Sequence, residues 1–472
     1  MNFEKISNNS KAWQLEKFHY RYWNLASEKI IIDAHNDIKH NLEHYGLNFE
    51  DKDLPISIVP TVLLAEEIKG LSKNTQIICK ILKKIISNFR NNHRNGYFDS
   101  FYHRFFAPYY KWWNLIAKEE RRLPDIMLMR FDAIKEHEGP WKLIETNTCC
   151  PGGVIHCARI RDAWKMTQLG YHLLKQEKVT TFGFDNAHFF VSQLADFAAK
   201  LNPDSPNIAV LNFKGTYSNE LQSLKRCFYE LKERGKIKDG EFLLGDIRDV
   251  TVREDQAYLN NTPLSIIYNK LDPLAIDPED QDIRGWILAS QSHKTDFLNS
   301  IGAMYLSEAK RVLAFLTNEN WNSVLELSEE EVLAINSLIP KTFLIEDYLQ
   351  QFDLQSLLRE KNRIVLKADT LTRGQGVSLG NQEDSNSWEL LVKKTRNNHG
   401  VIQTKCSIPT RVGVRVLDGT PKYIDEYYGI DIFMFNENME GFVSRSHLNQ
   451  IFNIGNGGCE SPVLILGEKN EN

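Results

Sequence analysis

The sequence contains no apolar run near the roughly 20 residues that a membrane-spanning helix needs, and it starts without the charged-then-apolar order of a secretory signal. Its net charge is only −5 over 472 residues, which gives no general attraction to nucleic acid or to acidic membranes. Cysteine is scarce, with 7 residues, and Cys149 and Cys150 are adjacent, so a disulfide framework is not expected. These features predict a cytoplasmic protein with reduced thiols and no nucleic-acid or membrane partner.

Internal repeats and low-complexity linkers are also missing, so domain boundaries follow only from changes in the sequence pattern. What is present is the composition of an ordinary globular protein, with 42% hydrophobic and 25% charged residues. A chain of 472 residues exceeds what one hydrophobic core usually supports, so we expect two or three packed lobes.

The first 120 residues have a mainly helical pattern. Apolar residues recur at helical spacing over Thr61–Ile68 and Gln76–Phe89. The stretch Phe98–Trp113 is dense in aromatic rings, which we expect to form core rather than a surface for stacking bases. Lys80–Arg90 is basic and amphipathic, which is typical of a solvated helix face; docking of an acidic carrier or membrane surface is the alternative.

From Asn207 onward strands and helices alternate, which predicts a small parallel α/β unit. Ligands of such units tend to lie beyond the carboxyl ends of the strands. Asn269, Lys270 and Asp272 occupy one such end, where they would contact a substrate or form a turn through Pro273.

Four polar residues on two neighbouring predicted strands form the most informative pattern. Arg130 and Asp132 share one face of the first strand, and Glu145 and Asn147 share one face of the second, because side chains alternate along a strand. Two carboxylates and an amide oxygen suit Mg²⁺, which takes its remaining ligands from water and substrate phosphates. An ordinary hairpin with an exposed charged face is the alternative.

A second pattern lies in the last third of the chain. The apolar run Arg363-Ile-Val-Leu-Lys367 predicts a buried strand that ends in a lysine, and the loop Thr372–Gly380 follows with Gly374, Gly376 and Gly380. A lysine charge and close backbone N–H groups are what a polyphosphate needs. The loop matches neither the P-loop nor the dinucleotide-binding fingerprint, and a plain glycine turn is the alternative.

The C-terminal region predicts antiparallel strands over 401–404, 423–426, 430–435 and 441–445, with the clearest turn at Asn436. Arg445 ends one strand opposite the glycine-rich segment Asn453–Gly458. A guanidinium fork in that position would bind phosphate or carboxylate oxygens bidentately.

Taken in order along the chain, these residues resemble the glutathionylspermidine synthase-like ATP-grasp ligases. The resemblance covers about residues 125–160 and 300–465. It implies an α/β (α+β) ATP-grasp fold in circularly permuted lobe order, with a helical N-terminal region and a small parallel pre-ATP-grasp unit. The expected divisions are a helical region at 1–120, magnesium-binding strands with following helices at 121–205, the α/β unit at 206–300, and a nucleotide-binding lobe at 301–472.

The resemblance also implies roles for individual residues. Asp132, Glu145 and Asn147 match magnesium ligands, while Arg130 and Arg445 match arginines that act on the transferring phosphate. ATP would be held by a lysine on a helix, the strand lysine with its loop, and a residue near the adenine: Lys310, Lys367, Arg373, Gly374, Gln375, Gly376 and Gln403. Arg311-Val-Leu after Lys310 departs from the family pattern, which weakens that match.

The implied activity is an ATP- and Mg²⁺-dependent carboxylate–amine ligase that forms an amide through an acylphosphate. Its partners would be a small-molecule or peptide carboxylate and an amine, free or bound to a carrier protein; the sequence specifies neither, nor the oligomeric state. Two alternatives stay open. One is an ATP-binding scaffold without ligase activity. The other is a metal-dependent hydrolase that uses Asp33, His35 and Asp37.

Overall fold

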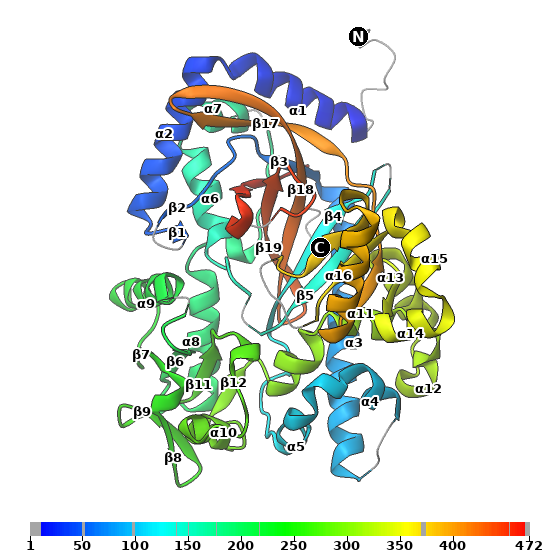
Figure 1. The fold of residues 1–472 in the computed structure, drawn as a ribbon. Coiled ribbons are helices and arrows are strands. Elements are labelled where there is room, and N and C mark those ends of the chain that lie inside the picture. Colours follow the sequence, from blue (N-terminus) through cyan, green and yellow to red (C-terminus); the bar gives the residue numbers. More distant parts are fainter. Residues whose placement is uncertain are drawn as a thin grey trace.

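The computed structural model describes residues 11–49, 52–96, 100–137, 139–149, 151–175, 177–216, 218–369, 374–452 and 454–467. An antiparallel sheet at its centre combines strands from the early and the late parts of the chain, which lie side by side in Figure 1. Its strands follow the order β20-β19-β18-β4-β5, and β17 also pairs with β18. Their bounds are β4 Leu128–Lys135, β5 Trp141–Asn147, β17 Thr410–Leu417, β18 Thr420–Phe435, β19 Asn438–His447 and β20 Cys459–Ser461.

The central strands form where apolar residues alternate with polar ones. In β4, Met129, Phe131 and Ala133 pack into the core while Arg130 and Asp132 face the other side. Asn436 and Glu437 connect β18 to β19 with φ values of 46° and 70°, the left-handed geometry that a tight hairpin turn requires. The strands expected over 430–435 and 441–445 and the turn at Asn436 are therefore confirmed. The separate strand expected over 423–426 is wrong, because it is the first part of the same continuous strand, β18.

A second antiparallel sheet carries the predicted lysine strand. It has the order β13-β16-β14-β15, and helices α14, α15 and α16 pack around it through a core that includes Leu366, Trp388 and Ile402. The bounds are β13 Thr342–Leu344, α14 Ile345–Gln351, α15 Leu354–Arg359, β14 Ile364–Lys367, β15 Val377–Leu379, α16 Ser385–Asn397 and β16 Val401–Thr404.

The expected parallel α/β unit is confirmed as a sheet of order β12-β11-β6-β7. Figure 1 shows it in green at one end of the molecule. A three-stranded sheet of β8, β9 and β10 adjoins it. The bounds are α8 Phe189–Leu201, β6 Ile208–Asn212, α9 Ser218–Glu233, β7 Phe242–Asp246, β8 Val250–Arg253, β9 Gln256–Leu259, β10 Thr262–Pro263, β11 Ile266–Asn269, α10 Arg284–Ala289 and β12 Asp296–Leu298.

The N-terminal part is helical as expected, with one correction. Residues Thr61–Leu64 form strand β3, which pairs in parallel with β21, and the helix begins only at Ala65. The apolar run Thr61-Val-Leu-Leu64 fits a short buried strand and a helix equally well, and pairing with the C-terminal strand decides between them. The bounds are α1 Lys11–Leu25, α2 Glu28–His44, β1 Asn48–Phe49, β2 Lys52–Asp53, β3 Thr61–Leu64, α3 Ala65–Arg94, α4 Ser100–Phe106, α5 Trp113–Lys118 and β21 Val463–Leu466.

Shorter helices complete the molecule: α6 His156–Lys165, α7 Gln168–Leu174, α11 Arg311–Leu316, α12 Asn322–Leu325 and α13 Glu329–Leu338. The described part of the aromatic segment after α3 is core, as predicted, except for Tyr110, which is exposed. Trp112, for example, stacks on Tyr305 with ring centroids 4.2 Å apart. Phe98 lies outside the described residues. The basic helix face is partly paired within the molecule, since Lys83 contacts Glu437 at 2.8 Å and Arg90 contacts Asp125 at 2.6 Å. Within the described ranges no helix has the length and apolarity to cross a membrane.

The buried side chain of Asn299 joins the strands that carry the site. Its Oδ1 accepts from the backbone N–H of Met127 at 2.7 Å and of Leu128 at 3.0 Å. Its Nδ2 donates to the carbonyls of Leu128 at 2.6 Å and Thr148 at 2.7 Å. Asn299 therefore fixes the start of β4 against the residue that follows β5.

We predict that Asn299→Ala lowers the free energy of unfolding by about 2–4 kcal/mol, because it leaves buried backbone donors and acceptors without these partners. Urea denaturation would show a lower midpoint. Asn397→Ala at the exposed end of α16 is the matched control, with an expected change within about 0.5 kcal/mol. Equal midpoints for the two variants would contradict this role of Asn299.

Candidate functional site

Two arginines and two aspartates form a buried cluster where three strands of the central sheet adjoin. Asp132 on β4 lies directly opposite Asp431 on β18. Arg130 Nε donates to Asp132 Oδ1 at 2.8 Å, and Arg445 Nη2 on β19 donates to Asp132 Oδ2 at 2.6 Å. Arg445 also contacts Asp431. The cluster therefore neutralises itself, with each arginine between carboxylates.

Burial and pairing act in opposite directions on these carboxylates. Burial would raise the pKa of Asp132, but the guanidinium groups of Arg130 and Arg445 outweigh it and hold the pKa below its ordinary value. For Asp431 burial prevails, and its pKa lies above the ordinary value. Asp132 is therefore the more firmly ionised member of the pair.

Glu145 and Asn147 lie next to the cluster on β5, in register with Asp132 and Arg130 respectively. Asn147 Nδ2 donates to Asp132 Oδ1 at 2.9 Å. Glu145 Oε1 lies 3.3 Å from Lys310 Nζ, and Lys310 precedes helix α11. The two predicted strands thus bring Arg130, Asp132, Glu145 and Asn147 together, as the sequence indicated.

A cavity of about 850 Å³, including the part open to solvent, lies between the central sheet and the sheet of the lysine strand. Asp132, Glu145 and Arg445 line it from one side, and Lys367 and Gly374 from the other. Lys367 Nζ donates to the Ile144 carbonyl at 2.6 Å, so the late lysine reaches the early strand. Burial lowers the pKa of Lys367 to about 8.

The remaining predicted nucleotide contacts differ in position. Gln403 lines the cavity. Its side-chain Nε2 donates to Thr342 Oγ1 at 3.1 Å, so the side chain also joins β16 to β13. Gly374 and Gly376 have φ values of 75° and 71°, which glycine alone adopts without strain. Gln375 is exposed, and Arg373 lies outside the described residues.

A second cavity adjoins the first at Glu145. It encloses about 490 Å³, including open solvent, and Asn147, Glu308, Lys310 and Asp369 line it with Tyr109. Asp369 Oδ2 accepts from the Tyr109 hydroxyl at 2.8 Å. Burial raises the pKa of Glu308 to about 7, against the lowering effect of backbone N–H donors at Thr148 and Cys149. Three carboxylates and one lysine give this cavity an acidic lining suited to cations.

Glu145 and Asn147 are the best-placed ligands for a divalent cation, because both line the second cavity and Glu145 borders the first as well. Asp132 already accepts four hydrogen bonds, from Arg130, Asn147 and Arg445. It can bind a cation only if an arginine turns away. The donor set of carboxylate, amide and further carboxylate oxygens fits Mg²⁺.

Three acidic residues of the site were missed in the sequence: Glu308, Asp369 and Asp431. Asp369 and Glu308 lie two positions from Lys367 and Lys310, and Asp431 is a lone carboxylate in the apolar run 430–435. A charged residue in a buried strand is unfavourable unless paired, and that signal could have identified Asp431.

The segment after β5 and the end of β11 have structural contacts. Arg130 Nη1 donates to the Gly152 carbonyl at 3.1 Å, and buried Lys270 pairs with Glu220 at 2.9 Å. Asn269 Oδ1 accepts from Trp286 Nε1 at 2.9 Å, and Asp272 caps the turn at Leu274. The turn through Pro273 is therefore confirmed.

The hydrolase alternative is wrong. Asp33, His35 and Asp37 lie on helix α2, with Asp33 and Asp37 exposed, rather than on a strand where they could reach one ion. They form no group of potential metal ligands; among the described residues such a group occurs at His188, Cys227 and Glu230. The six described cysteines are buried and form no disulfide with one another, and Cys150 lies outside the described residues.

No protein-family model and no curated protein sequence matches this chain. Among solved structures it is similar to a glutathione synthetase-like effector from Globodera pallida in its apo form, with a TM-score of 0.65 and 13% identity over 93% of this chain and 98% of that chain. A D-alanyl-alanine synthetase A from Vibrio cholerae matches at a TM-score of 0.26 and 9% identity, over 50% of this chain and 87% of that chain, which supports no argument. The first likeness shows that the two chains share a mixed α/β fold; the ATP-grasp assignment, the permuted lobe order and the narrower family stay predictions.

We predict that Arg445→Met destabilises the protein by about 3–5 kcal/mol, because Asp132 and Asp431 are left facing each other in a buried place. Adding Asp431→Asn should recover part of the loss, as a double-mutant cycle measures. Arg396→Met on exposed α16 is the control. Additive effects of the two substitutions at 445 and 431 would contradict the coupling.

Proposed function

We propose that this protein is a Mg²⁺-dependent, ATP-using carboxylate–amine ligase that forms an amide through an acylphosphate. The observation that supports it most is the cavity shared by Glu145, Lys367 and Arg445, which come from three distant segments of the chain. The fold likeness to a glutathione synthetase-like protein agrees with a ligase. The glutathionylspermidine synthase-like resemblance of the ordered motifs supports the same reaction class.

ATP would lie in the first cavity with its base among apolar side chains. Val365, Leu379, Ile408 and Phe452 line that part, beside Gln403 at the end of the β16 wall. Lys367 and Gly374 would hold the phosphates, together with Lys310 at the border to the second cavity. A flat aromatic base and a charged polyphosphate thus have separate walls.

Mg²⁺ bound by Glu145 and Asn147, and by Asp132 once its arginines turn to the phosphate, would supply positive charge to the polyphosphate. Arg130 and Arg445 are held by carboxylates in the structure. A phosphoryl group can replace these carboxylates as the partner of both guanidinium groups. The protein then stabilises the charge that moves with the phosphoryl group by preorganised electrostatics.

The reaction needs no nucleophile from the protein. The substrate carboxylate attacks the γ-phosphorus, ADP leaves, and the amine then attacks the acyl carbon and expels phosphate. The amine must lose its ammonium proton before it attacks. Glu308, with a pKa of about 7 in the acidic second cavity, is suited to accept that proton. The acid and the amine belong to the classes that the sequence leaves open: small molecules, peptides or carrier-bound groups.

Turnover is predicted to release ADP when the protein is mixed with ATP, Mg²⁺ and a library of carboxylates and amines. Asp132→Asn and Glu145→Gln should each lower kcat by about 10²–10³-fold, since each removes a carboxylate that would bind the Mg²⁺ acting on the phosphoryl group. Lys393→Met on the exposed face of α16 should leave turnover unchanged. ATP binding without turnover on any pair would favour a nucleotide-binding scaffold instead.

The affinity for ATP should also fall as the pH rises through about 8, because Lys367 binds phosphate only when charged and burial lowers its pKa to about 8. The lysine carries its proton below that pH, so affinity is full there and falls by up to about tenfold per pH unit above it. Calorimetric titration of wild type and Lys367→Arg would test this. The arginine variant should lose the dependence, whereas Lys393→Arg should keep it; an unchanged slope in Lys367→Arg would exclude Lys367 as its cause.

A further inference from the structure

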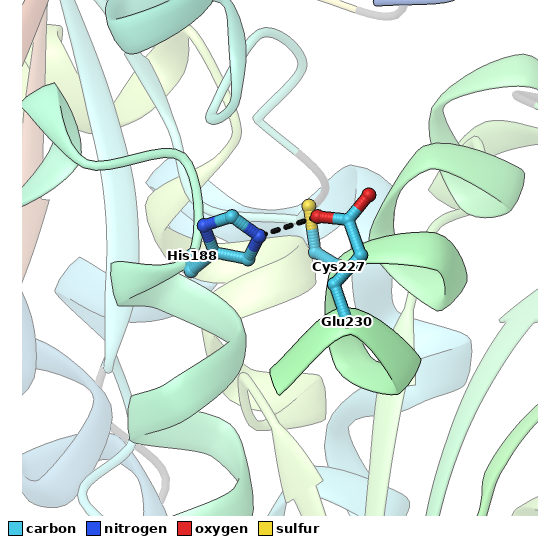
Figure 2. A group of neighbouring side chains, drawn as sticks. All are labelled: His188, Cys227 and Glu230. Atoms are coloured by element: carbon cyan, nitrogen blue, oxygen red, sulfur yellow. Dashed lines mark hydrogen bonds and ion pairs between the residues drawn. The ribbon is translucent and has the colours of Figure 1, made fainter. Parts of the chain in front are cut away.

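A group of three potential metal ligands lies away from both cavities, between helices α8 and α9. It consists of His188, Cys227 and Glu230, whose donor atoms all lie within 4.8 Å of one another. Figure 2 shows the imidazole of His188 pointing at the Glu230 carboxylate, with the Cys227 sulfur beside it. None of the three lines either cavity of the ligase site.

The backbone explains why these side chains meet. Cys227 and Glu230 are three positions apart on α9, a spacing that places them on one face of a helix. His188 immediately precedes α8, which packs against α9. Its Nε2 lies 2.5 Å from Glu230 Oε2. Two elements thus deliver nitrogen, sulfur and oxygen donors to one point.

This donor set has the chemistry of a zinc site. Zn²⁺ accepts imidazole, thiolate and carboxylate ligands at about 2.0–2.3 Å and commonly takes three protein ligands with water as the fourth. Tetrahedral ligands at those bond lengths lie about 3.3–3.7 Å apart, so the donors need shifts of roughly one ångström. The side chains of His188 and Glu230 keep 15% and 31% of their surface exposed, which leaves a side open for water.

The Arg159 guanidinium neighbours the Cys227 thiol and places a positive charge beside the sulfur. Arg159 is itself held over the ring of Tyr45 at 4.5 Å. When the thiol gives up its proton, thiolate and carboxylate together balance the two charges of the ion.

We infer that His188, Cys227 and Glu230 bind one Zn²⁺-type transition-metal ion that joins α8 to α9. The ion has a structural effect on the parallel α/β unit, because α8 contacts β6 and α9 contacts β7. An ordinary ion pair between His188 and Glu230 would fix the same two elements with no role for the sulfur. The thiolate therefore distinguishes the two explanations.

Cobalt titration of the full-length, chelator-treated protein tests the inference, because a thiolate bound to Co²⁺ gives a charge-transfer band and four-coordinate cobalt gives intense visible bands. We expect one equivalent of Co²⁺ to produce both and Zn²⁺ to abolish them. Cys227→Ala should lose the charge-transfer band, and His188→Ala and Glu230→Ala should each weaken binding by about tenfold or more. Cys79→Ala on α3 and Glu233→Ala on α9 are the matched controls and should keep wild-type spectra.

A second measurement, the change in Tm on adding Zn²⁺, tests the inference without a substitution at Cys227, in case that variant folds poorly. Zn²⁺ should raise the Tm of wild type and of Glu233→Ala, because a ligand that binds only the folded state stabilises it, and it should raise the Tm of Glu230→Gln much less. No band at stoichiometric Co²⁺, or a charge-transfer band that survives Cys227→Ala, would overturn the inference. Equal Zn²⁺ effects on the Tm of wild type and Glu230→Gln would do the same.

Discussion

The pairing of β4 with β18 sets the register that places Asp132 opposite Asp431, and the four-charge cluster exists only in that register. A shift of one residue in the pairing of β4 with β18 would turn Asp132 and Arg130 to the apolar face of the sheet and separate them from Asp431 and Arg445. Buried charges are tolerated only when they are paired, so Arg130, Asp132, Asp431 and Arg445 require one another. Because they come from strands near residue 130 and after residue 420, the site forms only when both parts of the chain have joined the sheet.

The ion pairs of the site determine which contacts a bound phosphate must replace. In the structure the arginines donate to Asp132 and Asp431, Lys310 contacts Glu145, and Lys367 donates to a backbone carbonyl. Under the proposed function, a phosphate oxygen gains such a donor only by replacing a carboxylate. A divalent cation makes that exchange favourable, since it gives the released carboxylate a new partner while it screens the phosphate. The exchange thus links cation binding to arginine release.

The sequence was informative where side-chain chemistry and strand alternation coincide. Arg130, Asp132, Glu145 and Asn147 share a face because of a period that any strand obeys, and the turn at Asn436 and the strand ending in Lys367 follow from local composition. The bringing together of Glu145 and Lys367 was predictable only from the order of motifs. The roles assigned to the site residues, and the domain divisions, stay predictions.

What the sequence could not specify depends on contacts between distant segments. Thr61–Leu64 became a strand because β21 lies beside it, and no local feature distinguishes that outcome from a first helical turn. His188 and Glu230 are separated by 42 positions, with no metal-binding spacing to connect them. Asp431 differs, since an isolated carboxylate within an apolar strand implies a partner even when the partner's identity is hidden.

Charge balance across the two cavities limits which form of nucleotide the proposed site can bind. Five carboxylates line the cavities: Asp132, Glu145, Glu308, Asp369 and Asp431. Four basic side chains line them, Lys310, Lys367, Lys405 and Arg445, and Arg130, the partner of Asp132, brings the basic side chains to the same number. A bare polyphosphate gains little from a neutral surface, because each lysine or arginine it approaches lies beside a carboxylate that repels it. A metal–polyphosphate complex carries both signs and can satisfy both kinds of side chain at once. Selectivity for the metal complex would therefore follow from the acidic residues as much as from the basic ones.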